Sequence, residues 1–125
     1  MNRSATIALC FTALLCLPAS VAFAQNAPPT YEADPSVYKI IFEDQNFRVI
    51  SATWKVGVTD KAHSHTALSV GYFVTDCTLR LRSADGKTVE INPKAGGSMA
   101  IANTPSHTAE NAGSKDCQAV LVERK

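Results

Sequence analysis

The sequence has little that would bind a polyanion, since its 12 lysines and arginines are offset by 11 aspartates and glutamates. It contains no run of basic residues, and this balance argues against nucleic acid or an anionic membrane surface as the main partner. The sequence also lacks a Ser-His-Asp spacing, a phosphate-cradling glycine loop and a Cys-x-x-Cys motif. The familiar signatures of serine hydrolases, nucleotide-binding proteins and dithiol oxidoreductases are therefore missing.

The first 24 residues have the pattern of a secretory signal peptide. Arg3 supplies a positive charge, residues 7–17 form an apolar run, and Ala22-Phe23-Ala24 gives a small-x-small cleavage site before Gln25. The apolar run is short for a membrane span, although an uncleaved anchor is the alternative. We predict a periplasmic or secreted protein that leaves the membrane once residues 1–24 are removed. Without Arg3 the formal charge of +1 falls to about zero.

Only two cysteines, Cys77 and Cys117, lie beyond the predicted signal peptide. An even number of cysteines in an exported chain favours a disulfide. Two buried free thiols, or one thiol in a reactive site, are the alternatives.

The remaining chain is long enough for one domain. Residues 25–36 are polar and rich in proline, and we expect a flexible leader there. Residues 37–125 then show strand-like alternation and no helical apolar stripe of useful length. The expected strands are 38–42, 47–56, 67–75, 77–82, 88–92, 98–102, 107–112 and 117–123. This pattern predicts an all-β antiparallel sandwich or barrel.

The chain has only three histidines, and all three fit one metal site. His63 and His65 are two apart, so in an extended segment their side chains point to the same face. His107, from a neighbouring strand, would complete a three-nitrogen set with an open coordination position. The spacing therefore predicts a metal site formed by these three imidazoles.

Gly57, five residues and then His63-Ser64-His65 match the first half of the cupin motif, and His107, three residues and then Asn111 match the end of the second. The chain thus resembles the cupin superfamily over roughly residues 34–125, and in particular small single-domain bacterial cupins. The resemblance implies an antiparallel double-sheet jelly roll, the cupin β-barrel. It also implies a divalent transition metal, Fe, Zn or Mn, held by the three histidines. In such a jelly roll the strand ending at Cys77 pairs with the strand opening at Cys117, which places a disulfide between them.

The match to the cupin motifs is incomplete. Ser69 and Val70 stand where the usual glutamate ligand would be, and Thr104 replaces the glycine that usually precedes the third histidine. The resemblance therefore assigns three metal ligands, and it does not assign a fourth.

If the alternation set by His63 and His65 continues, small residues face the metal and leave room for a pocket. A bulge after His65 would reverse this alternation. The expected pocket residues are Ser69, Gly71, Phe73 and Met99, with Trp54 as a further wall.

Two functions follow, and no catalytic residue is assigned in either. One is a metal-dependent oxygenase or isomerase acting on a small molecule. The other is a non-catalytic periplasmic protein that binds a metal or a small molecule, and a metal-free scaffold is a third reading. We expect a small-molecule ligand and, as an oligomeric state, a homodimer.

Overall fold

The computed structural model describes residues 26–66 and 68–125, and the predicted signal peptide lies outside these residues. One short helix precedes the strands in this part of the chain. The elements are α1 (Thr30–Ala33), β1 (Tyr38–Glu43), β2 (Phe47–Trp54), β3 (His63–His65), β4 (Ser69–Phe73), β5 (Leu79–Ser83), β6 (Thr88–Ile91), β7 (Ser98–Ile101), β8 (Thr104–Asn111) and β9 (Cys117–Arg124).

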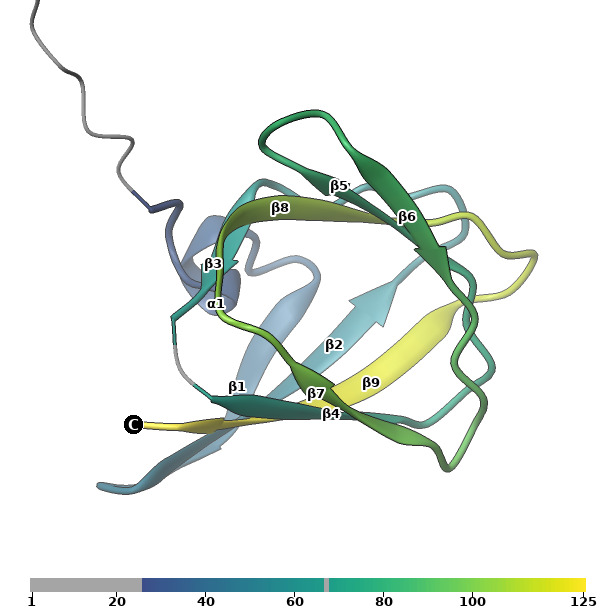
Figure 1. Cartoon of the computed structure of the whole chain (residues 1–125). Coiled ribbons are helices and arrows are strands. Elements are labelled where there is room, and N and C mark those ends of the chain that lie inside the picture. The colour runs from purple at the N-terminus through teal and green to yellow at the C-terminus, as the bar shows by residue number, and fades with distance from the viewer. Residues whose placement is uncertain (1–25, 67) are drawn as a thin grey trace, which may run out of the picture.

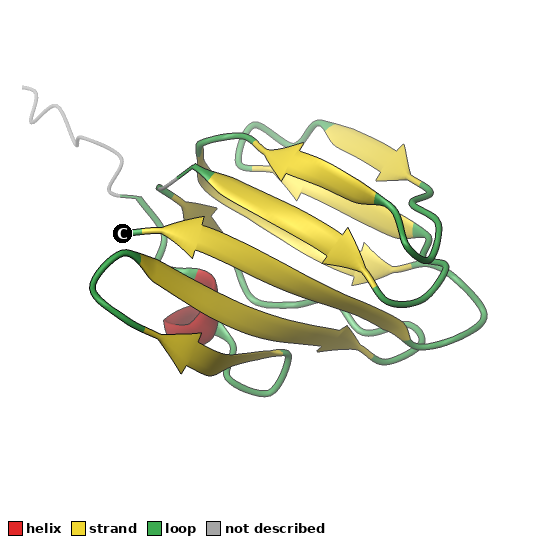
Figure 2. Cartoon of the chain, turned by 90° about the horizontal axis from the view of Figure 1, so that it is seen from below, coloured by secondary structure: helices red, strands yellow, loops and turns green. Residues whose placement is uncertain are grey.

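The strands form two antiparallel sheets that face each other and enclose the core (Figures 1 and 2). The five-stranded sheet has the order β1-β2-β9-β4-β7, and the four-stranded sheet has the order β3-β8-β5-β6. Strands far apart in the sequence are neighbours, as β2 and β4 both pair with the last strand β9. The predicted double-sheet jelly roll is confirmed.

Alternation along the strands determines which side chains fill the space between the sheets. In β9 every second residue, from Cys117 to Glu123, is buried and the residues between are more exposed. In β4 Ser69, Gly71 and Phe73 are buried, whereas Val70 and Tyr72 are exposed. The predicted inward face of this segment is therefore correct, although Ala67 lies outside the described residues.

A disulfide joins Cys77 to Cys117, with a Cα–Cα distance of 5.0 Å. Cys77 lies in the loop after β4, and β4 pairs with β9 in a register that sets Phe73 opposite Ala119. The end of β4 is thereby placed beside the start of β9, which confirms the predicted pairing.

The segment from 26 to 36, expected to be a flexible leader, is instead packed against the barrel. The Ala27 amide donates to the Pro105 carbonyl at 2.9 Å, and the Ser64 amide donates to the Pro28 carbonyl at 2.8 Å. The chain then turns into α1, where Thr30 is fully buried. The prediction of a loose arm was wrong here because Pro28 and Pro29 precede α1, Pro35 follows it, and none of them prevents main-chain pairing.

The strand boundaries differ from the prediction mainly by one to three residues at the ends. Simple alternation in the expected strand 88–92 would place Val89 inside, yet 60% of it is exposed, and β6 is an edge strand of the four-stranded sheet. Val56 is likewise exposed, since β2 ends at Trp54.

The outer face of the five-stranded sheet carries one apolar residue from each strand in a single cross-strand row. Strand register aligns Phe42, Val49, Val122, Val70 and Ala100 across the sheet. We call these residues the outer apolar row. No helix among the described residues is long and apolar enough to cross a membrane.

Candidate metal centre

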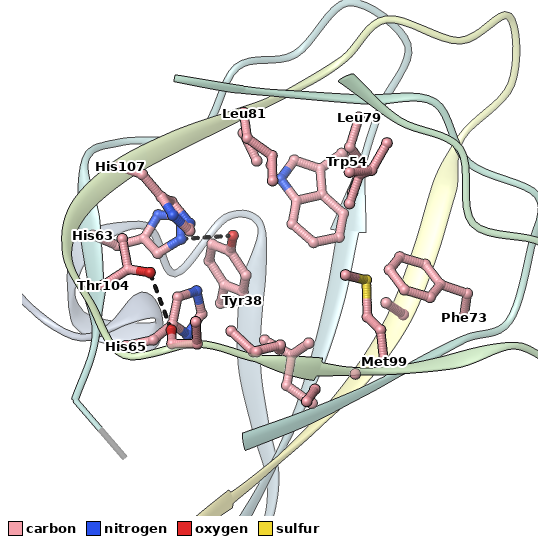
Figure 3. A pocket seen from close by; sticks show the side chains of 18 residues that line it. Tyr38, Trp54, His63, His65, Phe73, Leu79, Leu81, Met99, Thr104 and His107 are labelled. Atoms are coloured by element: carbon pink, nitrogen blue, oxygen red, sulfur yellow. Dashed lines mark hydrogen bonds between the residues drawn. The ribbon is translucent and has the colours of Figure 1, made fainter. Parts of the chain in front are cut away.

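The structure brings the three histidines together at one end of the space between the sheets (Figure 3). His63 and His65 lie on β3 and His107 lies on β8, where His107 is the cross-strand partner of His63. One ring nitrogen of each lies within 4.8 Å of the others. His63 and His65 are buried, and His107 is half-buried.

The orientation of the His63 ring is fixed by the backbone. Its Nδ1 lies 2.9 Å from the Lys61 carbonyl oxygen, so Nδ1 carries the proton and donates, while Nε2 keeps a lone pair. The Tyr38 hydroxyl lies 3.5 Å from this Nε2 (Figure 3), but its closer partner at 2.6 Å is the Asp60 carboxylate. Since the hydroxyl proton goes to Asp60, the Tyr38 hydroxyl oxygen and Nε2 of His63 face each other with lone pairs. Such an arrangement suits a cation better than a further donor.

Asp60 is a fully buried acceptor that links three strands behind this site. Besides the Tyr38 hydroxyl, it accepts hydrogen bonds from the Trp54 indole at 2.9 Å and from the Ala109 amide at 2.7 Å. Its Oδ1 also lies 3.6 Å from Nδ1 of His63. A buried carboxylate is tolerated when its oxygens are satisfied in this way. Asp60 therefore both joins the strands and stabilises the protonated Nδ1 of His63.

His65 has a different environment. Its Nδ1 is buried and has no hydrogen-bond partner among the described residues. A Glu123 carboxylate oxygen lies 3.9 Å away, too far for a hydrogen bond. Arg48 lies 3.8 Å from the other oxygen of Glu123. Burial raises the pKa of the Glu123 carboxyl, and the Arg48 guanidinium opposes this rise.

Burial and the neighbouring histidines keep the imidazoles of His65 and His107 neutral. Burial, together with the neighbouring His63 and His107, lowers the pKa of His65 to about 3. Burial and His63 likewise lower the pKa of His107 to about 4. Neutral imidazole is the form that binds a metal ion, so the donor set is ready for a metal at neutral pH.

A cavity of about 270 Å³ opens from the histidines into the space between the sheets. Of the predicted pocket residues, Gly71, Phe73, Met99 and Trp54 line it, whereas Ser69 is buried on the same face but lies outside the lining. The alternation argument identified Gly71 and Phe73 because β4 keeps its period of two.

The position of the usual cupin glutamate is occupied by Ser69, which is buried, and by Val70, which points to the outer face. The cross-strand partner of Ser69 is Glu123, on β9. A carboxylate is thus present near the histidines, but it comes from the adjacent strand.

The sequence prediction missed Tyr38, Asp60 and Glu123 as parts of this site. For Glu123 a signal was present, since it continues the buried alternation of Cys117, Ala119 and Leu121. A charged residue on the inward face of a strand marks a specific partner. Asp60 lies in a loop and shows no periodicity that could reveal it.

No family model matches the sequence, and no curated protein matches it. Solved structures do match the fold. A cupin domain from Bordetella pertussis Tohama I is similar with a TM-score of 0.66 and 18% identity, covering 82% of this chain and 99% of the other. A cupin 2 conserved barrel domain protein from Salinispora arenicola CNS-205 has a TM-score of 0.54 and 16% identity, covering 89% and 88%. A protein with a double-stranded β-helix domain from Klebsiella pneumoniae has a TM-score of 0.57 and 17% identity, covering 70% and 75%.

These likenesses define the class of fold: the chain is a cupin-type jelly roll. The three-histidine cluster in this fold is compatible with metal binding.

Proposed function

We propose that this chain is an exported member of the cupin superfamily that binds a divalent transition metal through His63, His65 and His107. The observation that carries the proposal is the convergence of three largely buried imidazoles at the end of an apolar cavity. Imidazole is a ligand for several first-row divalent ions, so the donor set alone does not identify the metal among Fe, Zn and Mn. The ion would supply a Lewis acid that polarises an oxygen of a small-molecule ligand.

The residues around the histidines have separate roles in this proposal. Lys61 and Asp60 fix the ring of His63 with its Nε2 lone pair free. Tyr38 remains a phenol, because burial and the Asp60 carboxylate raise the pKa of its hydroxyl well above the usual value. The apolar wall borders the remaining coordination positions and offers them no further protein ligand.

Export is a second part of the proposal. The pattern of residues 1–24 motivates it, and the Cys77–Cys117 disulfide supports it, since structural disulfides persist in oxidising compartments. The mass of the protein recovered from the periplasm or medium tests this, because cleavage before Gln25 removes 24 residues. Recovery of the full-length chain there would contradict it.

The catalytic form of the proposal is an oxygenase or isomerase, and the second candidate is a non-catalytic binder of metal or a small molecule. One observation favours the binder. Apart from the histidines, the described polar side chains lining the cavity are Tyr38, Trp54 and Thr104, and Tyr38 and Trp54 already donate to Asp60. No free carboxylate among these lining residues is placed to act as a general base.

Metal analysis tests the shared part of both candidates. The purified protein should contain about one first-row divalent ion per chain, and His107→Ala should lose most of it while its circular dichroism spectrum stays β-rich. Thr108→Ala is the matched control, because Thr108 lies next to His107 but faces a groove on the opposite side of β8. Retention of metal by His107→Ala would contradict the proposed site.

A further inference from the structure

The cavity beside the histidines has one polar end and a long apolar body (Figure 3). The imidazoles and the Tyr38 hydroxyl lie together at one side. The opposite side is formed by hydrocarbon, aromatic and thioether groups. The labelled members of that side are Trp54, Phe73, Leu79, Leu81 and Met99.

The apolar body offers a ligand almost nothing to hydrogen-bond. The Trp54 indole N–H is already donated to Asp60. No lysine, arginine, aspartate or glutamate is among the described residues that line the cavity. A charged group on the ligand, placed away from the histidines, would be buried without a partner, and such burial is strongly unfavourable.

The size of the cavity limits the ligand further. An engineered apolar cavity of about 150 Å³ is known to bind benzene, and pockets for drug-sized ligands begin near 300 Å³. At about 270 Å³ this cavity has room for one ring with a short substituent.

We propose that the cavity binds a single-ring, or similarly sized, molecule with an uncharged apolar body and one oxygen donor group. The apolar body lies against Phe73, Leu79 and Leu81, and the donor group points toward the three histidines. This inference rests on the proposed metal site, and it specifies the chemical class of the ligand.

Hydroxamates test the inference, since they share one metal-chelating group and differ only in the attached body. The full chain is loaded with Co(II), whose visible absorption reports the ion and changes when a ligand coordinates it. Benzohydroxamate should bind roughly ten- to a hundredfold more tightly than acetohydroxamate, because the phenyl ring is buried in the cavity. A benzohydroxamate with a para carboxylate should lose that advantage.

A variant that fills the cavity provides a second test. Gly71 lines the wall, has no positive φ, and an added Cβ there would meet Ile101 at 3.4 Å and Leu121 at 3.6 Å, both ordinary contacts. The backbone at position 71 therefore accepts a Cβ, and Gly71→Leu should lower the affinity for benzohydroxamate at least about tenfold more than that for acetohydroxamate. The control is Val70→Leu, on the outer face of the same strand, which should leave the benzohydroxamate preference intact.

The outcomes separate the two proposals. Equal binding of the two hydroxamates to the Co(II)-loaded protein, or tight binding of the para-carboxylate, overturns the ligand class and leaves the metal site standing. Absence of a Co(II) spectrum that depends on His107 overturns both. If Gly71→Leu does not fold, the hydroxamate series on the unaltered chain decides the question alone.

Discussion

Glu123 and His65 are close in space, with a carboxylate oxygen 3.9 Å from the imidazole Nδ1, although they come from opposite sheets. The same Nδ1 has no hydrogen-bond partner among the described residues. In metal sites the ring nitrogen that does not bind the ion is usually satisfied by a carboxylate, a carbonyl or water. Glu123 is therefore placed to orient His65 when a metal is bound.

The first prediction concerns this pair. Glu123→Gln should weaken metal affinity by about 10- to 100-fold, since outer carboxylates have effects of this size. Competition against a chelating indicator measures the affinity. Glu110→Gln is the matched control, because Glu110 pairs with Arg80 on the exterior and should leave the affinity unchanged. Equal affinities of the two variants would show that Glu123 does not act on the site.

The second prediction concerns Asp60 and the stability of the fold. Asp60→Ala leaves the buried donors of Tyr38, Trp54 and Ala109 without their acceptor. Each unpaired buried donor costs about 1–3 kcal/mol, so the metal-free protein should lose at least about 3 kcal/mol of unfolding free energy. Urea denaturation measures the loss. Asp85→Ala, at an exposed turn, should cost less than about 1 kcal/mol, and a similar loss in both variants would refute this role of Asp60.

The third prediction concerns pH. The pKa values of His65, about 3, and His107, about 4, lie below the ordinary histidine value of 6.5. The unfolded chain therefore binds protons that the folded chain does not, between about pH 6.5 and pH 3–4. The histidine contribution to stability is complete above about pH 6.5 and is lost as the pH falls, by at most about 1.4 kcal/mol per pH unit for each histidine.

The lowered pKa values of His65 and His107 should also extend metal binding to lower pH. Imidazoles with ordinary pKa values would release a metal as the pH falls through about 6.5. Here protonation competes weakly with the ion, so binding should persist below pH 6. Urea denaturation and metal titration at several pH values test both statements. A midpoint of metal loss near pH 6.5 would contradict the second statement.

The fourth prediction concerns the Cys77–Cys117 disulfide, which closes a loop with a sequence separation of 40. On the chain-entropy model its removal should cost about 3–4 kcal/mol. The double variant Cys77→Ser/Cys117→Ser, compared with the oxidised chain by urea denaturation, measures this. The histidines are on other strands, so the folded double variant should still bind metal. Two free thiols in the oxidised, denatured protein would show that the bond does not form.

The fifth prediction concerns self-association. The outer apolar row crosses all five strands of its sheet, and Phe42 and Val70 in it are 55% and 46% exposed. Large exposed apolar surfaces mark interaction sites, and we expect a second copy of the chain to cover this one. Sedimentation velocity should show a dimer that Val70→Lys dissociates. Val89→Lys, on the other sheet, should leave it intact, and a monomer at all concentrations would contradict the expectation.

The sequence predicted the inward faces of the strands and the His63–His65 pair because both depend on local spacing. Alternation in β4 and β9 is set by the period of two in an extended chain, so the inward faces of these strands could be read directly. The pairing of His63 with His107 is not local; His107 was expected on a neighbouring strand, and the resemblance to cupins supported this expectation.

What the sequence did not reveal depends on which strands pair. Glu123 was missed because only Ser69 and Val70, the positions after the second histidine, were considered for the usual carboxylate. Glu123 is instead the cross-strand partner of Ser69. Val89 was placed inside because alternation identifies a face but not whether another sheet covers it. The packing of residues 26–36 likewise depends on main-chain pairing with Ser64 and Pro105, which proline content does not predict.

The Asp60 carboxylate has two roles, because it accepts hydrogen bonds that join strands of the barrel and also lies beside the His63 ring. Its donors come from β1, β2 and β8, so a chain that diverged and abandoned its histidines would still need an acceptor at this position. Glu123, by contrast, is linked to β2 by a longer ion pair to Arg48, at 3.8 Å. During divergence a chain can therefore lose Glu123 and keep its barrel, whereas a chain that loses the acceptor at position 60 also loses stability of the barrel.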